Sequence, residues 1–201
     1  MRRENPKAQI AKIPDSLSVL VITTAALLAL ALGAVAIPAA TAAGIRRIHL
    51  TSPAFRTGQR MPRLYTADGA DISPPLAWGR VPSATRSIMI TLIDPDAPGP
   101  TPFVHWLIFN IPPTVHRLAA GMPRLGRLPR PQGAAQGRNS FGGIGYGGPA
   151  PPAGSAHHYH LRIYALDIRL AVRPASAAPS VYRALPGHIL ARGSIVLRYG
   201  R

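Results

Sequence analysis

Residues 87–93 constrain the fold most tightly, because this segment is largely apolar and β-branched on both of its faces. Such a run, stopped by the turn-forming segment Asp94-Pro-Asp-Ala-Pro98, is typical of a strand in the middle of a sheet. Residues 103–111 form a second apolar run of strand length. Residues 158–168 form a third, in which every second residue from Tyr159 to Ala165 shares one face. The chain is therefore predicted to be organised around a β-sheet.

Shorter elements complete the predicted domain. Residues 45–50 and 63–66 are predicted to form short strands, and residues 194–199 a closing strand. Residues 174–191 carry helix signals, with Ser176 as a candidate cap. Proline and glycine account for 42 of the 201 residues, which is high for a helical bundle and typical of a turn-rich β protein. We predict a mainly β fold, an antiparallel β-sandwich-like domain with one or two flanking helices.

The first 43 residues are predicted to be separate from that domain, which covers residues 44–201. A basic head precedes residues 16–37, which are uncharged and mostly apolar, and small residues follow with Ala-x-Ala spacing at Ala40 and Ala42. This order describes a secretory signal peptide over residues 1–43. The 22-residue uncharged run is also long enough to span a bilayer, so an uncleaved N-terminal membrane anchor is the alternative. Both interpretations place the domain outside the cytoplasm. A cleaved signal peptide makes it periplasmic or secreted, and an uncleaved anchor holds it at the membrane.

Residues 44–201 are strongly basic, with 19 arginines against five aspartates. Such an excess favours anionic partners such as phospholipid head groups. Export argues against nucleic acid as a partner, and no basic helix or interleaved aromatic stripe supports one. The chain contains no cysteine, which excludes a disulfide framework, a thiolate zinc site and a cysteine nucleophile.

Residues 114–156 are predicted to form one long connection, which is unusual in a compact domain and often functional. Its stretch 114–138 contains five arginines and no acidic residue. Two interpretations stay open at this point. The stretch either strengthens attachment to an anionic membrane or is a solvated loop.

Polar residues gather where the three best strands begin or end. Asp94 and Asp96 follow the first, His105 opens the second, and His157, His158 and His160 open the third. If these strands share a sheet, the side chains meet at one place, where Asp and His suit phosphate binding, metal binding or acid–base chemistry. Two plainer roles compete. Asp94 is suited to capping the N–H groups of its own turn, and His105 to being a hydrogen-bonded core histidine.

Several other chemistries lack their usual sequence patterns. A metal site would use Asp94, His105 and His157, but no HExxH or close histidine pair on a helix supports one. The glycine-dense segment 142–148 contains neither a P-loop nor a dinucleotide fingerprint, and the chain has no GxSxG elbow. We therefore predict no metal and no cofactor.

Four ordered motifs resemble one known family. The segments Asp94-Pro-Asp-Ala-Pro98, His105-Trp-Leu-Ile-Phe-Asn110, Gly145-Tyr-Gly-Gly-Pro-Ala-Pro-Pro152 and His157-His-Tyr159 are similar to those of the phosphatidylethanolamine-binding protein family, in its bacterial Raf kinase inhibitor-like branch. The resemblance covers roughly residues 46–201. It departs at His158, where the family usually has arginine, and at Ala150, where cysteine is common.

The resemblance implies a β-sandwich with a small pocket for phosphate-like anions, including phospholipid head groups. Carried over by motif, the anion would be bound by Asp94, His105, His157 and Tyr159, with Asp94 holding a histidine protonated and oriented. The pocket walls would be Ala97, Pro98, Gly147, Gly148 and Pro149, and the glycine N–H groups could add an anion nest.

We therefore expect an extracytoplasmic binding module without enzymatic activity. The alternative is an inhibitor or regulator of an envelope protein, such as a protease. A hydrolase that uses the Asp/His cluster is the third hypothesis, although no activated nucleophile is visible.

Overall fold

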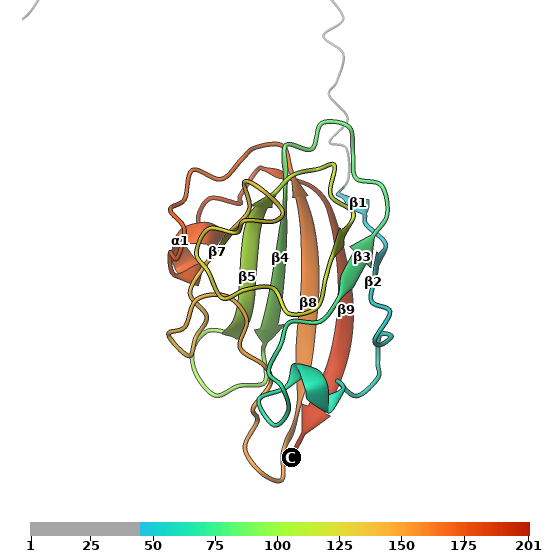
Figure 1. Cartoon of the computed structure of the whole chain (residues 1–201), viewed down its shortest axis with the longest axis vertical. Coiled ribbons are helices and arrows are strands. Elements are labelled where there is room, and N and C mark those ends of the chain that lie inside the picture. The colour runs from blue at the N-terminus through green and yellow to red at the C-terminus, as the bar shows by residue number, and fades with distance from the viewer. Residues whose placement is uncertain (1–44) are drawn as a thin grey trace, which may run out of the picture. The chain divides into compact units, whose positions relative to one another are not determined.

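The computed structural model describes residues 45–201, so the predicted signal peptide or anchor lies outside the described residues. Nine strands and one α-helix make up this part of the chain. They form a six-stranded sheet in the order β1-β9-β8-β4-β5-β7 and a three-stranded sheet in the order β2-β3-β6 (Figure 1). All pairings are antiparallel except that of β1 with β9. No helix in residues 45–201 is long and apolar enough to cross a membrane.

The larger sheet contains β1 (Arg46–Arg47), β9 (Ile189–Gly200), β8 (Ala156–Leu166), β4 (Ser87–Asp94), β5 (Phe103–Ile111) and β7 (Ala135–Gln136). The smaller sheet contains β2 (Leu50–Thr51), β3 (Leu76–Trp78) and β6 (Arg117–Leu118). Figure 1 shows β5, β4, β8 and β9 side by side, with β2 and β3 near β9 and α1 (Ala178–Tyr182) near β5 and β7.

The core has two parts, one on each face of the larger sheet. Ile88, Ile90 and Leu92 of β4 pack in an inner cluster with side chains of the smaller sheet, including Trp78. Met89 of the same strand packs in an outer cluster with Val181 of α1 and other residues that cover the far face. Because β4 is buried on both faces, its apolar run has to lie at the centre of the sheet. The predicted mainly β, sandwich-like fold is confirmed.

Two predicted elements differ from the structure at the N-terminal end. Residues 45–50 do not form one strand but contribute β1 to the larger sheet and the start of β2 to the smaller one. Residues 63–66 were predicted as a strand, but Arg63–Tyr65 is a 3-10 helix, because the N–H groups of Tyr65 and Thr66 donate to Pro62 and Arg63 three residues earlier.

Three predictions for the second half of the chain also differ from the structure. Residues 114–156 are not an unbroken connection, because β6 and β7 lie within them and join different sheets. Ser176 does not cap the helix: Ala177 occupies that position without a side-chain hydrogen bond, and Pro179 in the first turn favours the helix start instead. β9 begins at Ile189, five residues before the predicted closing strand.

Candidate functional site

The predicted site residues meet where three neighbouring strands begin or end. Ile93 of β4 pairs with Val104 of β5 on one side and with His160 of β8 on the other. Asp94, at the end of β4, is therefore close to the starts of both partners. All four predicted binding side chains are buried, with residue exposures of 3% for Asp94, 3% for His105, 8% for His157 and 0% for Tyr159. The predicted convergence of the strand ends is confirmed.

A β-bulge turns His105 toward this site. Leu92 pairs with Trp106 but its neighbour Ile93 pairs with Val104, so His105 is an extra residue on β5. Trp106 packs in the inner cluster and Val104 in the outer one, so the usual alternation breaks between them. The His105 ring instead faces Tyr159 of the inner cluster, with ring centroids 5.2 Å apart. Bulges commonly re-aim a side chain in this way next to functional sites.

Asp94 performs both of the roles that its sequence position suggested. Its Oδ2 atom lies 2.8 Å from Nδ1 of His157, which it orients. Its Oδ1 atom accepts hydrogen bonds from the backbone N–H groups of Asp96 and Ala97, at 2.9 and 3.1 Å. The carboxylate is thus a turn cap and the partner of a buried histidine at once.

Across residues 45–201, no three His, Asp or Glu side chains group closely enough to hold a metal ion.

His105 is held by a backbone carbonyl rather than by Asp94. Its Nδ1 atom lies 2.8 Å from the oxygen of Gly147, and because a carbonyl only accepts, Nδ1–H is the donor. Nε2 of His105 has no partner among the described residues, and the same is true of Nε2 of His157. Burial lowers the pKa of His105, and the opposing effect of Asp94 is smaller. The histidine that Asp94 orients is therefore His157 and not His105.

The Tyr159 hydroxyl is buried and has no hydrogen-bond partner among the described residues. Its ring stacks beside that of His157 at 6.5 Å and meets the edge of the His105 ring at 5.2 Å. Burial, and after it the charge of Asp94, raises the pKa of Tyr159, so the phenol stays a neutral donor. Trp78 Nε1 and Thr91 Oγ1 are also buried without a partner in residues 45–201, so what marks the Tyr159 hydroxyl as a binding group is that its ring contacts both site histidines.

The glycine turn supports the site by close packing and not as an anion nest. The N–H of Gly147 donates to the oxygen of His105 at 2.9 Å, and the N–H of Gly148 donates to Oδ1 of Asp71 at 2.6 Å. Neither N–H is left for an anion, so the expected nest is wrong. A Cβ atom at Gly148 would lie 2.8 Å from the backbone of Thr66, so only glycine fits.

The other predicted wall residues take different places around the site. Ala97 is held beside Asp94 by its N–H, and the carbonyl of Pro149 accepts a hydrogen bond from Ala67 at 3.0 Å. Pro98 is exposed in the turn that follows β4. His158, in the usual arginine position of the family, points to the opposite face of β8, where its ring pairs with Asp96 at 2.8 Å.

Sequence reasoning missed two residues around the site. Phe141 lies over His105 and Phe103, with centroid distances of 5.4 and 4.7 Å, although it is 54% exposed. Asp71 fixes the glycine turn through Gly148 and also pairs with Arg124. Neither Phe141 nor Asp71 lies in a sequence pattern that marks it as part of a site. Each contacts a segment that is distant in sequence, and local patterns do not predict such contacts.

Comparisons with known proteins point to one family. The family model described as phosphatidylethanolamine-binding protein matches residues 51–200. A UPF0098 protein of Methanothermobacter thermautotrophicus is 42% identical over 154 residues, which cover 77% of this chain and 99% of the relative. The UPF0098 protein YbhB of Escherichia coli is 36% identical over 156 residues, which cover 75% of this chain and 98% of the relative.

Two solved structures share the fold. Escherichia coli YbcL, described as a new member of the mammalian PEBP family, matches with a TM-score of 0.72 and 34% identity, covering 77% of this chain and 99% of its own. CT736 of Chlamydia trachomatis, described as a phosphatidylethanolamine-binding protein homolog, matches with a TM-score of 0.68 and 33% identity, covering 78% of this chain and 99% of its own.

Proposed function

Because this chain belongs to the phosphatidylethanolamine-binding protein family, we propose that its domain is a binding module for phosphate-like anions such as phospholipid head groups. The observation that carries the proposal is the buried Tyr159 hydroxyl, which has no partner among the described residues. It lies beside two histidine rings whose Nε2 atoms are also unpartnered within residues 45–201. An oxyanion supplies an acceptor for the phenol and, once the rings are protonated, for the two Nε2–H groups.

The two histidines can donate to an anion only when they are protonated. In each ring Nδ1 is already engaged, so Nε2 of the neutral form carries a lone pair and no hydrogen. Protonation converts Nε2 into a charge-assisted donor, and such a bond contributes roughly 1.5–3 kcal/mol. Tyr159 donates in either state. We propose that the anion is bound by one phenol and by imidazolium groups, with Asp94 fixing the orientation of His157.

We also propose that the module works outside the cytoplasm. This rests on the sequence of residues 1–43 alone, which lie outside the described residues. A reporter that is active only after export, fused behind residues 1–50, tests the location, and an inactive fusion would refute it.

Calorimetric titration with phosphoethanolamine at about pH 5.5 tests the binding function. We expect His157→Ala to weaken binding at least tenfold, because one charge-assisted hydrogen bond of roughly 1.5–3 kcal/mol is lost. His188→Ala is the matched control, since His188 pairs with Asp167 at 2.9 Å away from the site, and it should change the affinity less than twofold.

Equal affinities for His157→Ala and the wild type would refute the proposal. Hydrolysis of the ligand by the wild type, lost in His157→Ala, would favour the hydrolase hypothesis instead.

A further inference from the structure

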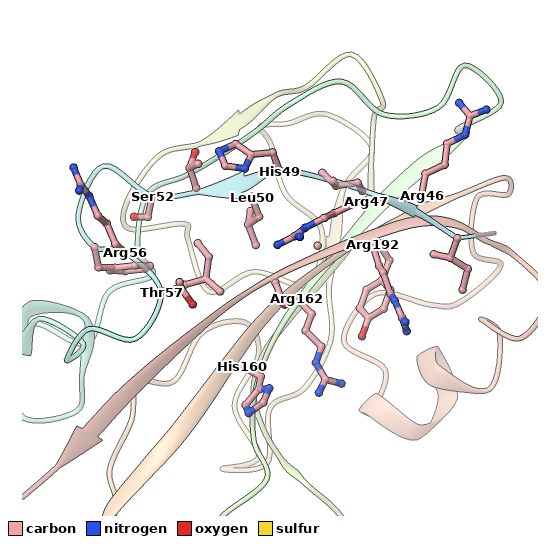
Figure 2. A pocket seen from close by; sticks show the side chains of 18 residues that line it. Arg46, Arg47, His49, Leu50, Ser52, Arg56, Thr57, His160, Arg162 and Arg192 are labelled. Atoms are coloured by element: carbon pink, nitrogen blue, oxygen red, sulfur yellow. The ribbon is translucent and has the colours of Figure 1, made fainter. Parts of the chain in front are cut away.

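A groove with a strongly basic lining lies between residues 45–57 and strands β8 and β9, which we call the arginine groove. Its volume is about 930 Å³, and no aspartate or glutamate lines it. Five arginines line it, namely Arg46, Arg47, Arg56, Arg162 and Arg192. Figure 2 shows Arg162, Arg192 and His160 along β8 and β9 on one side of the groove, with Arg46 extending away at one end and Arg56 at the other.

The sheet register sets three of these arginines close together. Arg47 of β1 is the partner of Arg192 on β9. Arg162 of β8 is opposite Ser194, which places it diagonally next to Arg192. Diagonal neighbours are near enough for long side chains to meet, and like charges placed this way repel each other. Three adjacent strands therefore present a row of positive charge without an obvious structural benefit.

No carboxylate of the described chain neutralises this row. Each of the five aspartates in residues 45–201 has its partner elsewhere: Asp68 with Arg201, Asp71 with Arg124, and Asp94, Asp96 and Asp167 with histidines. The groove arginines also donate no side-chain hydrogen bond to a described residue, unlike Arg124 or Arg169. Within residues 45–201, five guanidinium groups thus have no side-chain hydrogen-bond acceptor around one hollow.

His160, one of the two histidines that line the groove, lies near Arg162. Burial, and after it the charge of Arg162, lowers the pKa of His160. A bound anion would reduce the repulsion between the arginines. It would also counteract the lowering of the His160 pKa by Arg162. Arginine is the side chain best suited to such a site, because its planar fork matches the oxygens of a phosphate group.

We propose that the arginine groove is a second anion site, which binds the phosphate groups of a phosphorylated ligand. It is separate from the Asp94 site, because the side chains of β8 alternate between the two faces of the sheet. His157 and Tyr159 point to the inner face, whereas His160 and Arg162 point to the outer one. The inference therefore stands independently of the function proposed for the Asp94 site.

The test uses the full chain with His157→Ala, so that the groove is the only one of the two sites left intact. Calorimetric titration with pyrophosphate is compared between this protein and one that also carries Arg162→Gln and Arg192→Gln. We expect the groove variant to bind at least tenfold more weakly, because two bidentate donors are lost. Neither side chain donates a hydrogen bond to another residue of the part of the chain that the structure describes, so their removal should leave the fold intact.

The matched control carries Arg117→Gln and Arg127→Gln, which remove the same charge from the basic stretch 114–138. Neither residue lines the groove, and this control should bind pyrophosphate within twofold of its parent. A control that loses as much affinity as the groove variant would show nonspecific charge attraction and overturn the proposal. Unchanged binding by the groove variant would overturn it equally.

Vesicles identify the source of the phosphate. The same proteins are sedimented with phosphatidylcholine vesicles that contain or lack phosphatidylglycerol, at low and at high salt. Weaker binding of the groove variant to the anionic vesicles would assign the groove to a lipid surface. The difference from the parent protein should then shrink at high salt, which screens the attraction. If vesicle binding is unchanged while pyrophosphate binding is lost, the groove takes a soluble phosphorylated ligand. The vesicle result is interpreted only if the groove variant has lost pyrophosphate binding, because unchanged pyrophosphate binding already overturns the proposal.

Discussion

Replacing Asp94 by alanine should lower the free energy of unfolding by at least about 3 kcal/mol, because the Nδ1–H of buried His157 and two backbone N–H groups lose their acceptor, at about 1–3 kcal/mol each. The side chains of Asp94 and His157 are only 4% and 10% exposed, so water cannot replace the lost contact. The N–H groups of Asp96 and Ala97 lose their acceptor at the same time. For a domain of this size the melting temperature should fall by roughly 6–12 °C.

A second Asp–His pair, which joins the turn after β4 to strand β8, supplies the control. Asp96 and His158 are also 2.8 Å apart, but their side chains are 40% and 49% exposed. Asp96→Ala should therefore change stability by less than about 1 kcal/mol, as exposed pairs usually do. Thermal and urea unfolding of the two variants measure the difference. Equal decreases in the free energy of unfolding would mean that the burial of Asp94 does not determine how much it contributes to stability.

Sulfate should bind the wild-type protein at least tenfold more tightly at about pH 5.5 than at about pH 8. Burial lowers the pKa of His105 below its usual 6.5, so the free ring is neutral at pH 8 and its Nε2 cannot donate. A bound anion favours the charged ring and raises that pKa. The protein must therefore take up a proton on binding, and affinity rises as the pH falls toward the pKa of the free protein.

Sulfate is the probe because its own charge does not change in this pH range. His105→Ala should abolish most of the pH dependence, whereas His188→Ala should preserve it. An affinity that is equal at both pH values would exclude protonated histidine as the donor.

In the absence of an anion, the stability of the protein should fall as the pH falls, whereas the affinity for sulfate should rise. The unfolded chain takes up the His105 proton more readily than the folded protein, so this ring makes the free energy of unfolding fall as the pH drops through about 6.5. The loss stops once the folded protein is protonated as well. Sulfate should reduce this loss, which unfolding curves at several pH values would show.

The strands and their meeting point could be predicted because they depend on local patterns. The run at residues 87–93 is apolar on both faces and could only be central, and turn residues mark its end. The alternation of residues 157–160 also correctly predicted that the three histidines there could not all share one face.

The parts that were missed depend on contacts between distant segments. The bulge at His105 arises from how β5 pairs with β4, and nothing within β5 announces it. The glycine N–H groups look available in the sequence, but Asp71 and the backbone of His105 occupy them in the fold. The arginine groove is invisible for the same reason, since Arg47 is more than a hundred residues from Arg162 and Arg192, and the three meet only through strand register.

A crystal structure of the full chain soaked with phosphate at about pH 5.5 tests the central claim most directly. We expect phosphate oxygens at hydrogen-bond distance, about 3 Å, from Nε2 of His157 and from the hydroxyl of Tyr159. The His157–Asp94 hydrogen bond should persist in that structure, because it sets the orientation of the ring. Phosphate bound only elsewhere, for example in the arginine groove, would contradict the assignment of the Asp94 site as an anion site.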